Sequence, residues 1–102
     1  MWYEACPENS FRKQKSVEID GRRYALFRLD DGTYCLDDVC SHEYSLLSEG
    51  EIWDCDVYCP KHGSRFDIRS GAVKSFPATE PVRSYPVKIE NGLVYIDIPE
   101  EK

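Results

Sequence analysis

The sequence predicts an all-β fold, and three observations support this prediction. Turn signals recur about every ten residues along the chain, and the pairs Asp20-Gly21, Asp31-Gly32, Ser70-Gly71 and Asn91-Gly92 are among them. The segments between these turns are short and rich in Val, Ile, Tyr and Phe. No window of a dozen residues repeats its apolar positions with the period of a helix. We therefore expect an antiparallel sandwich or barrel of about eight to ten short strands.

The chain up to residue 76 predicts four hairpins. The segment "IDGRRYALFRLDDGTYCLDD", residues 19–38, indicates three strands joined by turns at Asp20-Gly21 and Asp31-Gly32. The segment "EGEIWDCDVY", residues 49–58, has the length of a further hairpin, and "FDIRSGAVKSF", residues 66–76, indicates another around Ser70-Gly71.

The last part of the chain predicts a final pair of strands. In "VKIENGLVYIDI", residues 87–98, the Asn91-Gly92 pair favours a tight hairpin because both residues tolerate positive φ. Val94, Ile96 and Ile98 alternate with their neighbours and form one apolar face. Two segments resist assignment as strands, 41–50 and 75–86. The best helical candidate, 43–49, is too short to alter the fold class.

Length and composition limit the possible functions. A chain of 102 residues is expected to form one domain, 1–102. Its formal net charge of −6 argues against binding to nucleic acid or to an anionic membrane surface. No apolar stretch is long enough to span a bilayer, and the start lacks the pattern of an export signal. Five cysteines are an odd number for a closed disulfide framework, so we expect a reducing, cytoplasmic location.

Cysteine and histidine form the most informative pattern. Cys40 and His42 form a C-x-H pair, and Cys59 and His62 form a C-x-x-H pair sixteen residues later. These are the only two histidines of the chain. Each pair is compact enough to lie on one loop, and the hairpin between them would bring the two loops together. Thiolate and imidazole are both good ligands for transition metals.

Three interpretations of this pattern remain open on the residues alone. The two cysteines could be buried apolar residues beside ordinary surface histidines. The two cysteines and the two histidines could form a structural zinc site, although zinc fingers usually group their cysteines apart from their histidines. The same four residues could instead hold a two-iron cluster, because each loop supplies one sulfur and one nitrogen ligand. The other cysteines, Cys6, Cys35 and Cys55, are expected to be buried core thiols.

The segments "CSH" and "CPKHG" resemble the two ligand boxes of Rieske [2Fe–2S] proteins. The sixteen-residue gap and the flanking segments resemble the short Rieske-type ferredoxins of bacterial ring-hydroxylating dioxygenase systems. This resemblance implies an antiparallel β-sandwich with a cluster-binding subdomain of two loops at about residues 38–67. It also implies one [2Fe–2S] cluster, with Cys40 and Cys59 on the inner iron and His42 and His62 on the outer iron.

The resemblance also implies which residues tune the cluster. Ser45 and Lys61 stand where high-potential Rieske proteins have two cysteines that clamp the loops, so that disulfide cannot form here. Ser64 retains a hydroxyl that donates to a cluster sulfur, whereas Phe66 replaces a tyrosine and has none to donate. Glu43 adds negative charge beside a ligand. We therefore expect a reduction potential in the lower part of the Rieske range of about −150 to +300 mV.

Several residues are expected to surround the exposed end of the cluster. The segment "FPATEPV", with Pro77 and Pro81, resembles the proline-rich loop that covers the cluster in this family; a plain surface turn is the alternative. Tyr44, Leu46 and Pro60 would form an apolar rim suited to brief docking through a small interface.

The expected function is electron transfer and not catalysis. No glycine-rich dinucleotide motif is present, and the chain is too short for a second redox centre. Similar ferredoxins pass electrons from a flavin-containing reductase to a terminal oxygenase, and a monomer suits this task. One alternative is the small Rieske-like subunit of assimilatory nitrite reductase. Another is a zinc-containing or metal-free binding module that keeps the fold.

Overall fold

The computed structural model describes residues 1–40, 45–61, 63–76 and 78–100, and these residues confirm the all-β prediction. They form two short 3-10 helices, η1 (Glu8–Ser10) and η2 (Leu47–Glu49), and ten strands. The strands are β1 (Trp2–Pro7), β2 (Gln14–Ile19), β3 (Arg22–Leu29), β4 (Gly32–Asp37), β5 (Ile52–Trp53), β6 (Asp56–Tyr58), β7 (Arg65–Asp67), β8 (Ser84–Tyr85), β9 (Val87–Glu90) and β10 (Leu93–Asp97). Neither helix in this part of the chain is long or apolar enough to cross a membrane.

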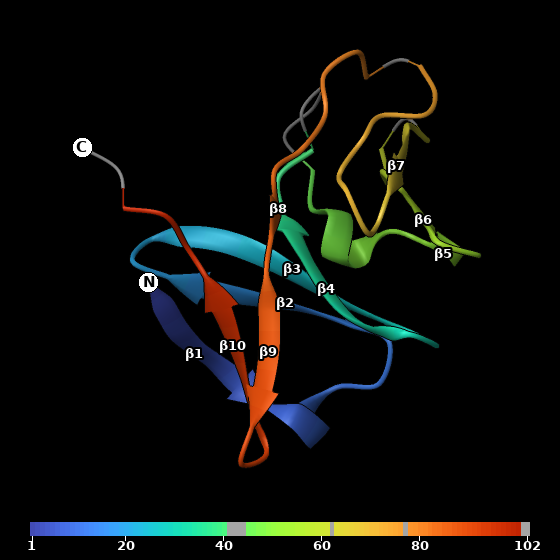
Figure 1. The fold of residues 1–102 in the computed structure, drawn as a ribbon. Coiled ribbons are helices and arrows are strands. Elements are labelled where there is room, and N and C mark those ends of the chain that lie inside the picture. Colours follow the sequence, from blue (N-terminus) through green and yellow to red (C-terminus); the bar gives the residue numbers. More distant parts are fainter. Residues whose placement is uncertain (41–44, 62, 77, 101–102) are drawn as a thin grey trace.

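The strands are arranged in three antiparallel sheets. The central sheet has the order β2-β3-β4-β8, a second sheet has the order β1-β10-β9, and a third has the order β5-β6-β7. Figure 1 shows the β1-β10-β9 sheet on one side of the central sheet and the β5-β6-β7 sheet at its other end. Cys59 lies between β6 and β7 of this third sheet, whereas Cys40 lies between β4 of the central sheet and β5 of the third.

Strand β3 contributes to two separate cores. Its side chains alternate between the two faces of the sheet, as they must in any strand. Tyr24 and Leu26 pack in the core shared with β1 and β10. Ala25 and Phe27 pack in the other core, which includes Phe66 of the third sheet. All five side chains are at most 1% exposed, so β3 is buried on both faces.

The hairpins predicted at Asp20-Gly21, Asp31-Gly32 and Asn91-Gly92 are confirmed. Asp20 and Gly21 have φ values of 52° and 81°, and Asn91 and Gly92 have φ values of 52° and 78°. Positive φ at both central residues is the requirement of a two-residue hairpin turn, which explains why these pairs occur here. The β5–β6 hairpin predicted from "EGEIWDCDVY" is also present, with Ile52 opposite Val57.

Two segments, 66–76 and 75–86, differ from the prediction: the first forms no full hairpin, and the second contains a short strand. After β7 the chain turns at Ser70-Gly71, but the returning segment forms only an isolated bridge between Phe66 and Val73. The turn instead packs against the later segment, because the Val82 amide donates to the Gly71 carbonyl oxygen at 3.0 Å and an added Cβ at Gly71 would lie 2.1 Å from the carbonyl oxygen of Val82. The chain therefore continues toward the central sheet, and the proline-rich segment 75–86 ends in the short strand β8.

Candidate metal centre

Cys40 and Cys59 belong to the same core although they are distant in sequence. Cys40 follows β4 and Cys59 follows β6, as expected for ligands at the ends of strands. They are 4% and 2% exposed and belong to the same core cluster, together with Phe66. None of the five cysteines forms a disulfide. Two buried thiols from different loops therefore meet in one core, which suits a group that takes two sulfur ligands.

The two cysteine loops are closed by the same hydrogen-bonding pattern. The amide of Cys40 donates to the carbonyl oxygen of Ser45 at 2.8 Å, and the amide of Cys59 donates to that of Ser64 at 2.7 Å. In each loop the hydrogen bond therefore joins the cysteine to the residue five positions later. The residues flanking each loop are paired in antiparallel fashion, Val39 with Leu46 through an isolated bridge and Tyr58 with Arg65 between β6 and β7. The fold therefore presents two equivalent short loops, each starting at a cysteine.

Both histidines belong in sequence to these closed loops. His42 falls between Cys40 and Ser45, and His62 falls between Cys59 and Ser64. Five of the predicted site residues, however, lie outside the described residues. They are His42, Glu43, Tyr44, His62 and Pro77. Their roles stay predictions, and the arrangement of the site rests on the cysteines and on the residues around them.

Ser64 and Ser75 fasten the second loop to the segment that follows β7. Ser64 is fully buried, and its Oγ accepts a hydrogen bond of 2.9 Å from the amide of Ala78. Ser75 Oγ accepts a hydrogen bond of 2.9 Å from the amide of Arg65. The O–H of Ser64 finds no acceptor among the described residues. It therefore remains able to donate to a group held by the loop, as the resemblance implies.

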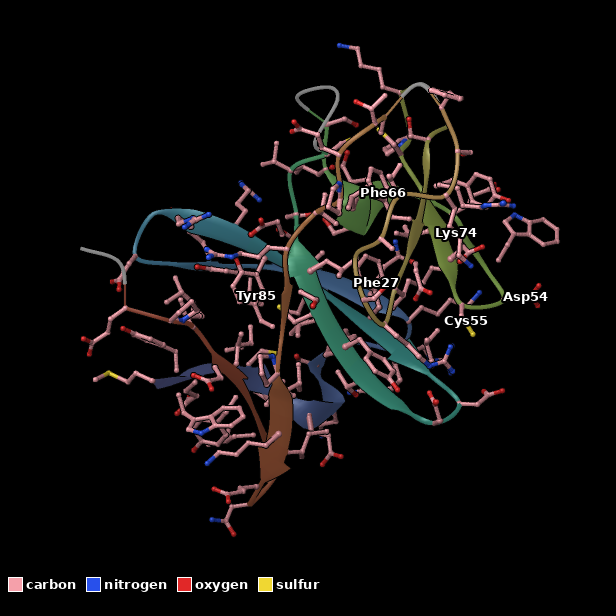
Figure 2. All side chains as sticks on the ribbon, turned by 45° about the horizontal axis from the view of Figure 1, so that its top comes forward. Phe27, Asp54, Cys55, Phe66, Lys74 and Tyr85 are labelled. Carbon is pink, nitrogen blue, oxygen red and sulfur yellow. The ribbon has the colours of Figure 1, made fainter. Side chains whose placement is uncertain are left out.

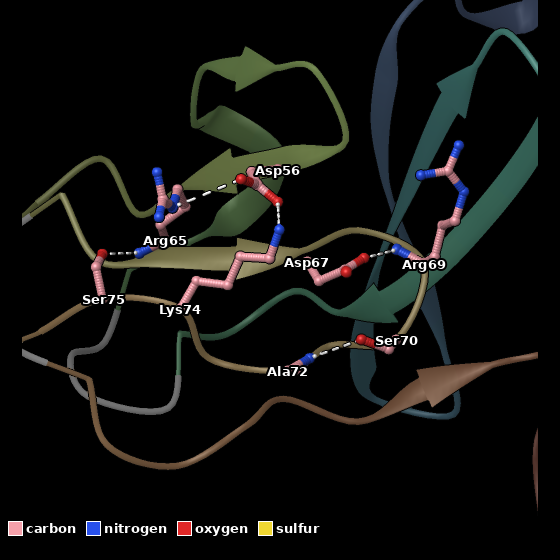
Figure 3. A network of polar contacts seen from close by, with 8 residues as sticks. All are labelled: Asp56, Arg65, Asp67, Arg69, Ser70, Ala72, Lys74 and Ser75. Carbon is pink, nitrogen blue, oxygen red and sulfur yellow. Dashed lines mark hydrogen bonds and ion pairs between the residues drawn. The ribbon is translucent and has the colours of Figure 1, made fainter.

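A network of charged side chains reinforces the third sheet, as Figure 3 shows. Asp56 of β6 accepts from Lys74 Nζ at 2.8 Å and lies 3.5 Å from Arg65 Nε. The hydrogen bond to Asp56 raises the pKa of Lys74. In the turn after β7, the amide of Arg69 donates to the Asp67 carboxylate at 2.8 Å. These contacts join β6 and β7 to the returning segment and support the second loop from outside.

The remaining predicted residues occupy different environments. Phe66 is fully buried in the core that contains both cysteines. Leu46 is half-buried, and Pro60 and Pro81 are exposed. The expectation that Cys55 is a buried core thiol is wrong, because it is half-buried. Figure 2 places Cys55 beside Asp54 at the turn between β5 and β6, where the tight hairpin leaves too little chain to cover it.

The sequence reasoning missed an exposed aromatic side chain, that of Phe76. It is 82% exposed on the segment fastened to the second loop. Beside it lies a hollow of about 330 Å³. The lining residues are Val73, Lys74, Ser75, Phe76, Ala78 and Thr79. The sequence did not predict that this side chain is exposed, because Phe is usually buried.

Comparison with known families identifies the class of the domain. Residues 1–86 match the family model of the Rieske [2Fe–2S] domain. This stretch contains both cysteine loops, the whole third sheet and the proline-rich segment. The fold and the two cysteine loops therefore define a Rieske iron–sulfur protein with one [2Fe–2S] cluster.

Individual relatives narrow this class. The chain is 46% identical over 99 residues to the anthranilate 1,2-dioxygenase ferredoxin subunit of Burkholderia cepacia, covering 95% of this chain and 92% of the relative. The ferredoxin of Sphingomonas yanoikuyae B1 superposes with a TM-score of 0.90 and 32% identity, covering 97% of this chain and all of that one. The chain belongs to the Rieske [2Fe–2S] ferredoxins, which are electron-transfer components of dioxygenase systems.

Two further structures bear on the choice of partners. A chain of the complex of reduced oxygenase and oxidised ferredoxin in carbazole 1,9a-dioxygenase has a TM-score of 0.86 and 30% identity, with 93% of this chain and 91% of that chain covered. A proposed NADH-dependent nitrite reductase small subunit from Mycobacterium tuberculosis has a TM-score of 0.82 and 25% identity, with 94% and 93% covered.

Proposed function

We propose that Cys40, His42, Cys59 and His62 hold the [2Fe–2S] cluster, with the cysteines on the inner iron and the histidines on the outer one. The two equivalent loop closures carry this proposal, because each loop starts at a buried cysteine and contains one histidine in sequence. Bound in this way, the cluster supplies one-electron chemistry. The protein's own contribution is to bury the sulfur ligands, fix the loops and exclude water from the inner side.

The electron route that we propose runs from a flavin-containing reductase to a terminal oxygenase acting on an aromatic ring. The similarity to the anthranilate 1,2-dioxygenase ferredoxin subunit supports it, as does the similarity to a chain of the oxygenase–ferredoxin complex of carbazole 1,9a-dioxygenase. Five cysteines without a disulfide favour a reducing cytoplasm. A monomer fits this role, since one exposed end of the cluster must meet two partners in turn.

The surface used for docking would be the rim around the two loops. Leu46, Pro60 and Pro81 lie on the segments that adjoin the loops, and Tyr44 and Pro77 belong to the same segments in sequence. Small apolar rims of this kind suit electron-transfer complexes that must form and separate quickly.

The central experiment is the analysis of anaerobically purified protein. We expect two irons and two sulfides per chain, and a rhombic paramagnetic signal after dithionite reduction with an average g below the free-electron value. Cys59→Ser should abolish the cluster, whereas Cys55→Ser, a change at a nearby cysteine that is not a ligand, should retain both irons. Zinc in place of iron, or a metal-free protein, would refute the proposal and favour a binding module.

The nitrite reductase alternative is tested by electron delivery. With the cognate type of reductase and an aromatic-ring dioxygenase, reduced protein should support substrate hydroxylation, and the oxidised form should reappear within each turnover. A subunit of nitrite reductase would instead remain bound to its enzyme and fail to reoxidise with the dioxygenase. The higher identity to the dioxygenase ferredoxin subunit, 46% against 25%, favours the first outcome.

A further inference from the structure

Asp38 is a fully buried carboxylate close in sequence to a proposed cluster ligand. It lies two residues before Cys40, and both side chains are buried, at 0% and 4% exposure. Val39 between them is 36% exposed and points outward. The chain bends at Asp38 after β4, and Val39 forms an isolated bridge with Leu46, so the buried side chains of Asp38 and Cys40 stand on either side of one exposed residue. A buried aspartate is rare and requires an explanation.

Three hydrogen bonds hold the Asp38 carboxylate. Its Oδ1 accepts from the amide of Ser48 at 2.8 Å. Its Oδ2 accepts from Ser48 Oγ at 3.0 Å and from Ser16 Oγ at 2.6 Å. Ser16 belongs to β2, and Ser48 belongs to η2, directly after the first cysteine loop. The carboxylate therefore joins both ends of that loop to the central sheet.

The main chain of Asp38 strengthens the same connection. Its amide donates to the carbonyl oxygen of Arg23 at 3.2 Å, and its carbonyl oxygen accepts from the amide of Leu47 at 2.6 Å. Leu47 is itself fully buried in the core that contains Cys40. The segments before and after the first loop are thus fixed to each other and to β3 through one residue.

No basic group of the described residues forms an ion pair with the Asp38 carboxylate. Among the described residues, the groups within hydrogen-bond distance of the carboxylate are two hydroxyls and one amide. Arg23 Nη1 is near, but it donates to Ser16 Oγ at 3.1 Å and reaches the carboxylate only through that hydroxyl. The backbone amide of Ser48 can only donate, which suits a carboxylate oxygen at Oδ1, and a charge inside a protein is weakly screened.

We propose that Asp38 positions the Cys40 loop and that its buried negative charge holds the reduction potential of the cluster low. This inference rests on the proposed ligation by Cys40. Adding an electron to the cluster adds negative charge beside an existing one, so reduction becomes less favourable. Net charge and groups that orient the ligands are established determinants of cluster potential.

The charge is tested with Asp38→Asn, which keeps the shape of the side chain and can accept from the Ser48 amide. We expect a higher midpoint potential in protein-film or dye titration, with two irons per chain and an unchanged paramagnetic line shape. The matched control is Glu18→Gln, which removes one negative charge from the exposed face of β2 and should leave the midpoint where it is. An Asp38→Asn midpoint equal to that of the control overturns the charge role.

Positioning is tested separately with Ser48→Ala, which retains the carboxylate and removes one of its bonds to the loop end. Release of iron to a chelator should become several-fold faster, while the midpoint potential does not rise. A midpoint rise as large as that of Asp38→Asn would overturn the charge role, because loop displacement alone would then explain both variants. An unchanged release rate in both Ser48→Ala and Ser16→Ala would overturn the positioning role, even if Asp38→Asn fails to fold.

The underlying ligand assignment has its own test. Cys40→Ser should lose the cluster altogether. If Cys40→Ser retained both irons, the proposed ligand set would fail, whereas a failure of the Asp38 variants alone would leave that set intact.

Discussion

Ser64 Oγ accepts a hydrogen bond of 2.9 Å from the amide of Ala78, and both residues are buried, at 0% and 2% exposure. This contact joins the second cysteine loop to the proline-rich segment through a side chain that can also donate. One hydroxyl therefore has two possible functions, to fix the covering segment and to stabilise negative charge on the cluster.

Replacing Ser64 by Ala should lower both stability and potential. The buried Ala78 amide would lose its acceptor, which costs about 1–3 kcal/mol of unfolding free energy. The midpoint potential should fall because the donor to the cluster is lost. Ser75→Ala is the matched control, since Ser75 Oγ likewise accepts from one amide at 2.9 Å, that of Arg65. It should reduce stability without moving the midpoint. Equal midpoints in the two variants would rule out the donor role of Ser64.

Replacing Phe66 by Tyr should raise the midpoint potential. Phe66 is fully buried in the core of the two cysteines, so the new hydroxyl would enter that core and could donate to a cluster sulfur. Overpacking should cost about 1–3 kcal/mol of stability. Phe27→Tyr is the control, because Phe27 is as deeply buried in the same core but belongs to β3. A destabilised Phe66→Tyr protein with the wild-type midpoint would show that the hydroxyl points elsewhere.

Local sequence signals were sufficient to predict the hairpins. Asn91-Gly92 predicts its turn because the pair itself supplies the positive φ values that the hairpin needs. The sequence likewise predicts that Cys59 stands at the end of a strand, as it does after β6. Cys55 is predicted to be buried, but it lies in the turn between β5 and β6 and is half-buried.

Features that depend on distant residues could not be predicted. Asp38 is held by Ser16 and Ser48, which lie 22 and 10 residues away in sequence, and nothing local indicates that these three side chains meet. Strand β8 has only two residues and exists because it pairs with β4. The exposure of Phe76 follows from the way the segment around it is fastened to the second loop, a relationship that also has no local signature.

Stability should fall in alkaline solution partly because of Tyr85. Its hydroxyl donates to Asp37 at 2.7 Å. Burial, and secondarily Asp37, raise the pKa of Tyr85. A folded-state pKa above the unfolded value of about 10 gives stability that is fully present below pH 10 and is lost as pH rises further. Burial also raises the pKa of the Cys35 thiol, so some loss of folding stability begins nearer pH 9. This earlier loss occurs equally in the wild type and in a Tyr85 variant.

The contribution of Tyr85 is therefore obtained from a comparison. Urea unfolding followed by circular dichroism between pH 8 and 11 should show a steeper loss for the wild type than for Tyr85→Phe above about pH 10. Trp2→Phe, a change in β1 that removes no titratable group, should retain the wild-type slope. Parallel curves for the wild type and Tyr85→Phe would contradict the assignment.

Phe76 should contribute to docking of the oxygenase. Its 82% exposed side chain lies on the segment fastened to the second loop, and buried aromatic anchors commonly contribute more than about 1 kcal/mol to binding. Phe76→Ser should retain the cluster and its midpoint but reduce the second-order rate of electron transfer to the oxygenase about tenfold. Ile89→Ser, on the 39% exposed position of β9, should have no effect. Equal rates for the two variants would exclude Phe76 from the interface.

Loss of the cluster should loosen one core and leave the other intact. Cys40 and Cys59 belong to the core between the central and third sheets, whereas Val94 and Ile96 belong to the core on the other face of β3. The two cores share a strand but no side chain, and cooperative units of a protein can open separately. Such independence is also what a cluster-binding subdomain at about residues 38–67 requires.

Hydrogen exchange measures this directly. After anaerobic removal of iron and sulfide, the amides of Cys40 and Cys59, which close the two loops, should exchange at least tenfold faster than in the loaded protein. The amides of Val94 and Ile96 should keep their protection, because no proposed ligand packs against them. In the loaded Asp38→Asn variant, the amide of Cys40 should exchange faster than in the loaded wild type, whereas the amide of Cys59 should not. Uniform loss of protection throughout the chain would mean that the domain opens as a single unit and that the loops have no separate stability.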